Sequence, residues 1–438
     1  MSAPGAGPRV LVLTVVHHPE DARIRYRQIP AMLAAGFAVT YAAPFTGYGV
    51  ARPPGMATLD VPRAIGRHRM AALRAARAVL AGARSRVDLV LLHDPELLLA
   101  LGLDRWPAPG PAVDRWPAPG PAVDRWPAPG PARGPAVDRW PAPGPAVAWD
   151  VHEDTAAAVA LRSWIPALLR RPAVAGVRVA ELLAERRVHL LLAEYDYAAR
   201  FARPHPVVPN TTTVPVQVPP PAGDRVVHLG HLTAARGAPE LLLAAREIRR
   251  RTGGTVTTHL LGPADAATEP AVRAAVAAGD VVWHGFVPND VAVREIEGAA
   301  AGLVLMRDNA HHRSKLPTKA MEYLAHGVPT VAAELPALTR LLTQSGGGVT
   351  VPAGPPERVG QAAAAAVLAL LGDPDLRSAT ATAGHRWAAG HLDWAVHAAQ
   401  FTDVLARWAG TDRAGAGPDQ MGADTDQVGA ATGQLGTV

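Results

Sequence analysis

Short continuous apolar runs alternate along the chain with longer stretches in which apolar residues recur every three or four positions. Residues 9–16 form an apolar run rich in Val and Leu, which is typical of a strand buried on both faces of a parallel sheet. A helix is predicted over residues 21–35 and a second strand over 37–43. A long arginine-rich helix is then predicted over 66–84, followed by a strand over 87–92. Strands alternating with helices predict a parallel sheet covered on both faces.

The same alternation begins again at residue 225. The second half is expected to contain strands and helices in the order 225–230 (strand), 239–250 (helix), 256–261 (strand), 281–283 (strand), a helix, 301–306 (strand), a helix after Pro317 and 329–333 (strand). The fold class predicted from both halves is α/β, with two Rossmann-like, doubly wound parallel-sheet domains facing a cleft.

The domain limits follow changes in composition. We expect an N-terminal domain over 1–205, a linker over 206–224 with six prolines, and a C-terminal domain over 225–390. A last helix over 391–409 is expected to pack back toward the N-terminal domain. Residues 410–438 lack periodicity and read as a disordered tail.

A proline-rich tandem repeat interrupts the first domain at residues 104–147. It contains four copies of Asp-Arg-Trp-Pro-Ala-Pro-Gly-Pro-Ala-Val, the third lengthened by four residues. Proline at alternate positions is incompatible with helices and sheet ladders, and a ten-residue period is too short for a solenoid. We interpret the repeat as an expanded loop, for which one copy would be long enough; a ligand for a proline-binding partner is the alternative.

Composition narrows the range of partners. The chain has no cysteine, no apolar stretch long enough to span a membrane and no signal-peptide pattern, so a cytoplasmic protein is expected. The net charge is +5, but the basic residues are scattered and aromatics make up 5%, which argues against nucleic acid. The basic amphipathic helix at 66–84 leaves two possibilities open: peripheral contact with an anionic membrane at its inner face, or an ordinary solvated face.

Only two of the 43 basic residues are lysines, Lys315 and Lys319, and they lie four residues apart before an expected helix. Lys319 and Glu322 share one helix face. A helix N-terminus with a lysine can hold a phosphate, and a carboxylate one turn later can accept hydrogen bonds from two ribose hydroxyls. A surface ion pair between the two side chains is the alternative.

A second candidate phosphate site follows the strand at 225–230. Gly230 and His231, then Arg236, lie between this strand and the next helix. Such a turn directs backbone N–H groups and the helix dipole toward an anion, and Arg236 adds a full positive charge.

Seven short motifs, in order, resemble the family-4 retaining glycosyltransferases of the GT-B fold, of the bacterial cell-surface, exopolysaccharide or natural-product type. They occupy residues 17–24, 93–97, 150–154, 208–210, 230–237, 284–288 and 316–329. The resemblance implies a glycosyltransferase that moves a sugar from a nucleotide diphosphate sugar to a hydroxyl acceptor. The acceptor would be a lipid-linked sugar, a polysaccharide or a small molecule.

The resemblance also implies roles for individual residues. Catalysis is assigned to His152 and Glu153, and ribose binding to Glu322. The donor sugar is assigned to Ser314 and Lys315. The diphosphate is assigned to the turn and the helix start, through Gly230, His231, Arg236, Pro317, Thr318 and Lys319. No metal and no cofactor other than the donor substrate is expected.

Two departures from the family pattern keep other functions open. His231 stands where the family often has arginine, and Ser314 stands where it often has a glutamate eight residues before Glu322. The alternatives are a non-catalytic nucleotide-sugar-binding homologue and a nucleotide-sugar isomerase on the same fold.

Overall fold

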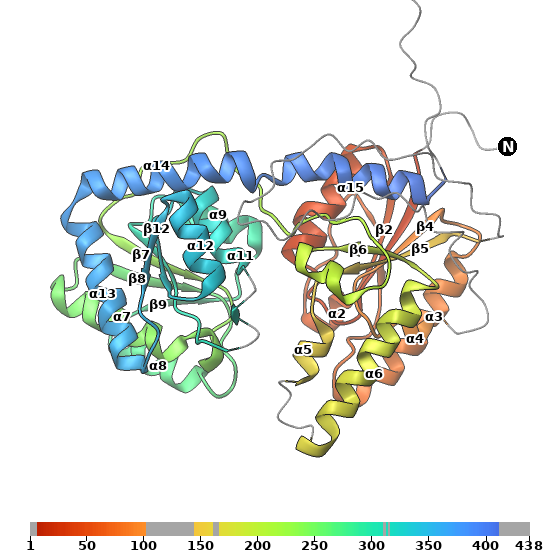
Figure 1. Ribbon diagram of the computed structural model, residues 1–438, viewed down its shortest axis with the longest axis horizontal. Coiled ribbons are helices and arrows are strands. Elements are labelled where there is room, and N and C mark those ends of the chain that lie inside the picture. The colour runs from red at the N-terminus through yellow and green to blue at the C-terminus, as the bar shows by residue number, and fades with distance from the viewer. Residues whose placement is uncertain (1–6, 102–143, 161–165, 310–311, 314–315, 411–438) are drawn as a thin grey trace, which may run out of the picture.

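The structure is a computed structural model that describes residues 7–101, 144–160, 166–309, 312–313 and 316–410. Figure 1 shows two α/β units lying beside each other, each built around a six-stranded parallel sheet. The prediction of two Rossmann-like, doubly wound domains is therefore confirmed. The expected proline-rich loop lies outside the described residues except for 144–147, and the expected tail lies outside them from residue 411.

The N-terminal sheet has the strand order β3-β2-β1-β4-β5-β6. Its strands are β1 (Arg9–Leu13), β2 (Ala38–Ala43), β3 (Ala57–Asp60), β4 (Leu89–Leu92), β5 (Ala146–Val151) and β6 (His189–Leu192). The chain winds in opposite directions from β1 and β4. Ligands of open α/β sheets bind beyond the carboxyl ends of the strands at such a reversal.

Helices cover both faces of this sheet, as each face has its own apolar cluster. They are η1 (Ile24–Gln28, a π-helix), α1 (Ile29–Ala34), α2 (Phe45–Tyr48), η2 (Gly66–His68), α3 (Arg69–Ala83), α4 (Leu97–Ala100), α5 (Thr155–Ala160), α6 (Ala167–Glu185) and η3 (Tyr195–Arg200). Buried residues of α3, α4 and α6 belong to one cluster, whereas residues of η1 and α1 belong to the other.

The C-terminal sheet repeats this topology in the order β12-β11-β10-β7-β8-β9, with the reversal between β7 and β10. Its strands are β7 (Arg225–Leu229), β8 (Thr257–Leu261), β9 (Val282–Gly285), β10 (Ala301–Val304), β11 (Thr330–Ala333) and β12 (Gly348–Val351). Its helices are η4 (Ala234–Arg236), α7 (Ala238–Arg251), α8 (Glu269–Ala277), α9 (Asn289–Ile296), α11 (Thr318–Ala325), α12 (Pro336–Ser345), α13 (Pro356–Gly372) and α14 (Pro374–His391).

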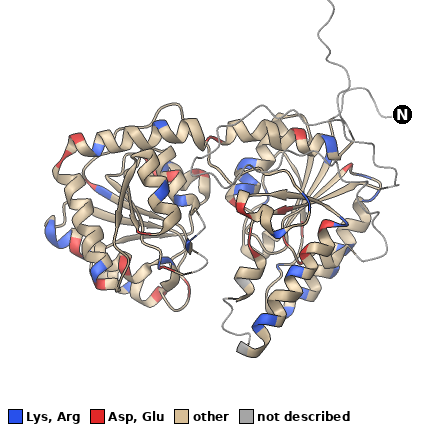
Figure 2. Cartoon of the chain, in the orientation of Figure 1, with Lys and Arg blue, Asp and Glu red and all other residues tan. Residues whose placement is uncertain are grey.

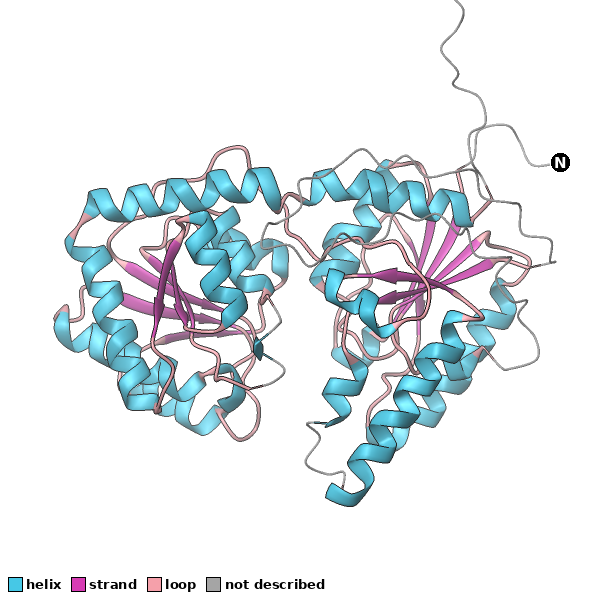
Figure 3. Cartoon of the chain, viewed as in Figure 1, coloured by secondary structure: helices cyan, strands magenta, loops and turns pink. Residues whose placement is uncertain are grey.

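The last helix connects the two halves. Figure 3 shows α14 running along the C-terminal domain and α15 (Trp394–Trp408) running along the N-terminal one. Phe401 and Leu405 of α15 are fully buried in the same cluster as Ile29 of α1. The Trp394 indole donates to the Arg27 carbonyl at 3.2 Å. The chain therefore crosses between the domains twice, first through residues 206–224 and again between α14 and α15.

Candidate functional site

The polar motifs of the N-terminal domain meet at the carboxyl ends of three neighbouring strands. His17 lies in the loop after β1, His93 and Asp94 follow β4, and Asp150 and His152 lie at the end of β5. Asp94 holds the first of these loops, since its Oδ2 accepts from the backbone N–H of Val15 and Val16. These residues lie at the edge where the sheet topology predicts ligand binding.

Asp150 is the buried anion of this cluster. Its carboxylate accepts two hydrogen bonds from Arg23, both of 2.8 Å, and a third of 2.8 Å from the Gln28 amide. Burial alone would raise the pKa of Asp150, but the guanidinium of Arg23 holds it well below its usual range. Asp150 is therefore a carboxylate throughout the physiological pH range.

His152, the predicted catalytic residue, lies between this anion and a second histidine. Its Nδ1 is 3.4 Å from Asp150 Oδ2, and its Nε2 is 2.9 Å from His17 Nε2. Burial would lower the pKa of His152, but Asp150 raises it above the ordinary value. Two imidazole nitrogens at 2.9 Å require one proton between them, so one ring donates and the other accepts. His17 belongs to the motif at residues 17–24, but nothing in the sequence indicated a role for it.

Three ligand atoms of His93, Asp150 and His152 lie within 4.8 Å of one another, a spacing that could hold a metal ion. Whether these three residues would bind a metal depends on the other hydrogen bonds of Asp150. The same oxygen that would face the ion, Oδ2, already accepts from Arg23 and Gln28. A cation placed there would be repelled by the adjacent guanidinium, so the set fits a charge network better than a metal centre.

The C-terminal domain presents the predicted phosphate turn at the end of β7. Gly230 has a φ of +109°, and its N–H donates to the Leu261 carbonyl at 2.7 Å. Gly237 follows η4 with a φ of +81°, and a Cβ there would lie 1.6 Å from the Leu305 carbonyl oxygen. Only glycine fits this position. His231 and Arg236 of the turn are exposed.

Lys319 extends from the first turn of α11 to the back of this turn. A Cβ at Gly230 would lie 3.3 Å from Lys319 Nζ, and Nζ is 3.2 Å from His228 Nε2. Burial, and then the charge of Arg236, lower the pKa of Lys319 to about 7. Pro317 is the N-cap of α11 and Thr318 its first residue. The predicted diphosphate residues therefore come together around one turn.

Glu322 lies one turn further along α11 and is 3% exposed. Its Oε1 accepts from Asn289 of α9 at 2.9 Å and from Arg27 of the N-terminal domain at 3.1 Å. Lys319 is equally buried, so the alternative of a surface ion pair between Lys319 and Glu322 is wrong. Nothing in the spacing of the sequence indicated Arg27 or Asn289, because both reach Glu322 from distant segments.

Two further pairs bring the domains together. The rings of His18 and Phe286 lie with centroids 4.3 Å apart. Desolvation lowers the pKa of Arg236, and the carboxylate of Glu153 in the other domain opposes this shift. The negative charge of Glu153 is therefore close enough to the phosphate turn to act on Arg236. Ser314 and Lys315, predicted to meet the donor sugar, lie outside the described residues.

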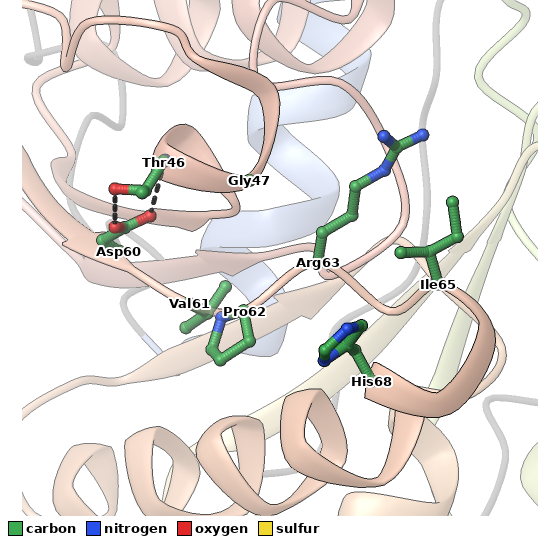
Figure 4. A pocket seen from close by; sticks show the side chains of 8 residues that line it. All are labelled: Thr46, Gly47, Asp60, Val61, Pro62, Arg63, Ile65 and His68. Carbon is green, nitrogen blue, oxygen red and sulfur yellow. Dashed lines mark hydrogen bonds between the residues drawn. The ribbon is translucent and has the colours of Figure 1, made fainter.

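A pocket of about 540 Å³ opens near the carboxyl ends of the strands in the N-terminal sheet. Figure 4 shows it between the segments that follow β2 and β3, lined by Thr46, Gly47, Asp60, Val61, Pro62, Arg63, Ile65 and His68. The backbone N–H of Ala64 donates to the Val15 carbonyl at 2.8 Å, which ties this wall to the loop that carries His17. The Arg63 guanidinium lies 3.9 Å from the ring centroid of Tyr48, whose ring in turn contacts His18.

Comparison with known proteins shows what the chain is similar to. Residues 223–373 match the family model described as glycosyl transferases group 1. Sucrose-phosphate synthase from Thermosynechococcus elongatus superposes with a TM-score of 0.61 at 16% identity, covering 91% of this chain and 98% of that chain. No curated protein matches the sequence.

Two other solved structures are similar over the same extent. WaaG, a glycosyltransferase involved in lipopolysaccharide biosynthesis, has a TM-score of 0.59 at 12% identity, covering 91% of this chain and 99% of that chain. HepE of Anabaena, in complex with UDP-glucose, has a TM-score of 0.57 at 13% identity with the same coverage. At these identities the structural likeness establishes the fold.

Proposed function

We propose that the chain is a group 1 glycosyltransferase of the GT-B fold that transfers a sugar from a nucleotide diphosphate sugar to a hydroxyl acceptor with retention and without a metal. The observation that carries the proposal is the buried lysine behind the glycine turn. Among the described residues, Lys319 makes no ion pair with a carboxylate, and its closest polar contact is His228. A buried cation beside an exposed arginine and a glycine turn is suited to an anionic ligand.

The diphosphate would lie on the Gly230 turn, between Arg236 and Lys319. The ribose would then reach Glu322. Arg27 and Asn289 both donate to Oε1 of this carboxylate. Among the described residues no donor occupies Oε2, which leaves it able to accept from the ribose hydroxyls. Each hydrogen bond to a charged acceptor contributes about 1.5–3 kcal/mol. HepE was solved with UDP-glucose, which makes UDP-sugars the first donors to test.

The transferred sugar would extend from the diphosphate toward the N-terminal domain. His152 and Glu153 directly follow β5 of that domain, and the negative charge of Glu153 acts on Arg236. Cationic groups on the leaving-group side would stabilise the departing diphosphate whichever face is attacked. Retention is proposed because the motifs resemble those of the family-4 retaining enzymes.

The acceptor would enter through the pocket beyond β2 and β3. Among its lining residues, Asp60 offers an acceptor and Arg63 a donor for polyol recognition. The wall of this pocket is bonded to the loop that bears His17. A hydroxyl held there would therefore approach the sugar from the side of His152.

Metal independence rests on the charges already present. Lys319, Arg236 and the N-terminus of α11 supply positive potential where the leaving diphosphate gains charge. Turnover in excess EDTA should therefore match turnover without it. Strong inhibition that Mg²⁺ or Mn²⁺ reverses would contradict this part of the proposal.

A donor screen followed by product analysis tests the function. Thermal shifts against UDP-, GDP- and dTDP-sugars should single out one donor, since a ligand at 100 times its dissociation constant stabilises by about 2.7 kcal/mol. With that donor and an acceptor mixture, glycosylated product of unchanged anomeric configuration is expected. Donor binding without any turnover would favour the non-catalytic homologue, and a new nucleotide sugar formed without acceptor would favour the isomerase.

A further inference from the structure

The outer surface of α6 carries apolar side chains that the fold leaves uncovered. Leu168 is 91% exposed, Leu169 57% and Val179 56%. Leu182 and Leu183 further along the helix are also exposed, at 40% and 48%. Residues 168, 172, 175, 179 and 182 are all exposed and recur every three or four positions, which places them on one helix face. A continuous apolar stripe of this length on a soluble surface marks an interaction site.

The charges beside this stripe have one sign. Arg171 on α6 is exposed, as are Arg186 and Arg187 directly after the end of the helix. The two carboxylates of the helix are buried and paired, Glu181 with Arg178 and Arg200, and Glu185 with His205. Figure 2 shows basic positions recurring along α6, also near its N-terminal end. An apolar stripe flanked only by arginine complements an anionic bilayer surface.

A second helix on the same side of the sheet has the same sign of charge. α3 shares its apolar cluster with α6 and contains no acidic residue, and Arg74 and Arg77 on it are exposed. The basic amphipathic pattern at 66–84 had left membrane contact by this helix as one of two possibilities, and the apolar residues of that pattern are Met70, Leu73 and Leu80. In the structure Leu80 is buried and Leu73 packs against the core, so Met70 alone of these three is exposed. The apolar contribution must come from α6.

The position of α6 relates it to the transfer site. In a β-α-β unit the helix begins beyond the carboxyl end of the preceding strand, here β5, where His152 lies. Figure 1 shows the N-terminal end of α6 projecting beyond the body of its domain. Leu168 and Leu169, the most exposed apolar pair of the helix, are at that end.

We propose that the exposed face of α6, with the arginines of α3 beside it, docks the protein on an anionic lipid bilayer, with the Leu168–Leu169 end entering the interface. Docking in this orientation would bring the carboxyl edge of the N-terminal sheet toward the membrane surface. An acceptor carried by a lipid would then be within reach of the pocket beyond β2 and β3. Docking itself does not depend on which donor or acceptor the protein uses.

Vesicle binding tests the proposal with the full chain. Sedimentation with phosphatidylcholine vesicles containing 30% phosphatidylglycerol is expected to retain the protein, whereas pure phosphatidylcholine is expected to retain at least about tenfold less. Leu168→Asn with Leu169→Asn should weaken binding to the mixed vesicles by about tenfold or more. Arg171→Gln with Arg186→Gln should weaken it too, and should reduce the effect of added salt.

Leu376→Asn is the matched control. Leu376 is a comparably exposed leucine at 47%, but it lies on α14 of the other domain, so its replacement should leave vesicle binding unchanged. All variants change exposed side chains, and unaltered melting temperatures would verify their folding. Absence of vesicle binding, equal binding to neutral and anionic vesicles, or full binding by the Leu168 and Leu169 variant would each overturn the proposal. A nucleotide-binding measurement on the same samples keeps this result separate from the fate of the proposed function.

Discussion

Arg27 of the N-terminal domain and Glu322 of the C-terminal domain form a buried ion pair, with Nη2 3.1 Å from Oε1 and both side chains at most 4% exposed. The other hydrogen bonds of the Arg27 side chain go to Asn210 and Thr212, in the segment between the domains. The carboxylate predicted to bind the donor ribose is thus also the point at which the N-terminal domain is attached. Donor binding and domain arrangement share one side chain.

We predict that Arg27 and Glu322 are strongly coupled in stability. Removing one partner of a buried pair leaves a desolvated charge, which costs about 3–5 kcal/mol. Arg27→Ala and Glu322→Ala should each lower the free energy of unfolding, and the double variant should lose less than the sum. Urea unfolding of the four proteins measures the coupling, and Arg25→Ala on the same helix serves as the control. Additive losses would show that the ion pair contributes nothing of its own.

We predict that Glu322 binds the donor beyond its structural role. Glu322→Gln keeps a hydrogen-bond acceptor for Asn289 or Arg27 but removes the charge offered to the ribose. The dissociation constant of the variant for the nucleotide sugar should therefore rise by about tenfold or more, because each hydrogen bond to a charged acceptor contributes about 1.5–3 kcal/mol. Calorimetry on the folded variant measures this. An unchanged dissociation constant would remove Glu322 from the donor site.

We predict that donor affinity depends on pH through Lys319. Its pKa of about 7 in the free protein means that the ammonium form, which a diphosphate requires, is lost as the pH rises above 7. Between pH 6 and pH 8 the donor dissociation constant should increase by about tenfold. Lys319→Gln should bind more weakly and show a flat profile over this range. A wild-type profile that is equally flat would mean that Lys319 does not contact the donor.

We predict that the proline-rich repeat is dispensable. β4 and β5 pair directly in the sheet, and one copy is long enough to connect α4 to β5. Loop-closure entropy changes only logarithmically with length, so deleting residues 104–137 should alter stability by about 1 kcal/mol or less. The melting temperature should stay within a few degrees of the parent, with donor binding intact. Failure to fold, or loss of acceptor turnover alone, would show that the tract packs on the core or shapes the acceptor site.

The central strands of both sheets could be predicted from the sequence, because strands buried on both faces are continuous apolar runs. β3 was missed because it is a short edge strand in which polar and apolar residues are both partly exposed. No element was predicted either for the segments that form α6, β6, α8, α12, β12, α13 and α14. Edge elements carry less of the hydrophobic pattern, so their signal is weaker.

The candidate site was predictable only where its residues are neighbours in the chain. The Gly230 turn and the start of α11 are local motifs with a physical reason for their spacing. Arg27 and Glu322, in contrast, are 295 positions apart, and their contact exists only once both domains have folded. The same holds for the 2.9 Å contact between His17 and His152. Local patterns can predict which groups bind, but they do not predict which distant groups hold them in place.

The proposed glycosyl transfer depends most on the cationic turn that would hold the diphosphate of the donor. The direct measurement is calorimetric titration with the nucleotide sugar that gives the largest thermal shift. It is titrated into the wild-type protein, into Lys319→Ala and Arg236→Ala, and into the control Arg250→Ala. Arg250 lies on α7 of the same domain, is exposed and pairs with Glu247. We expect the first two variants to lose about tenfold or more in affinity, as charge-assisted contacts contribute about 1.5–3 kcal/mol, and the control to match the wild type. No binding of any nucleotide sugar by the wild type, or affinities of Lys319→Ala and Arg236→Ala within twofold of it, would contradict the account.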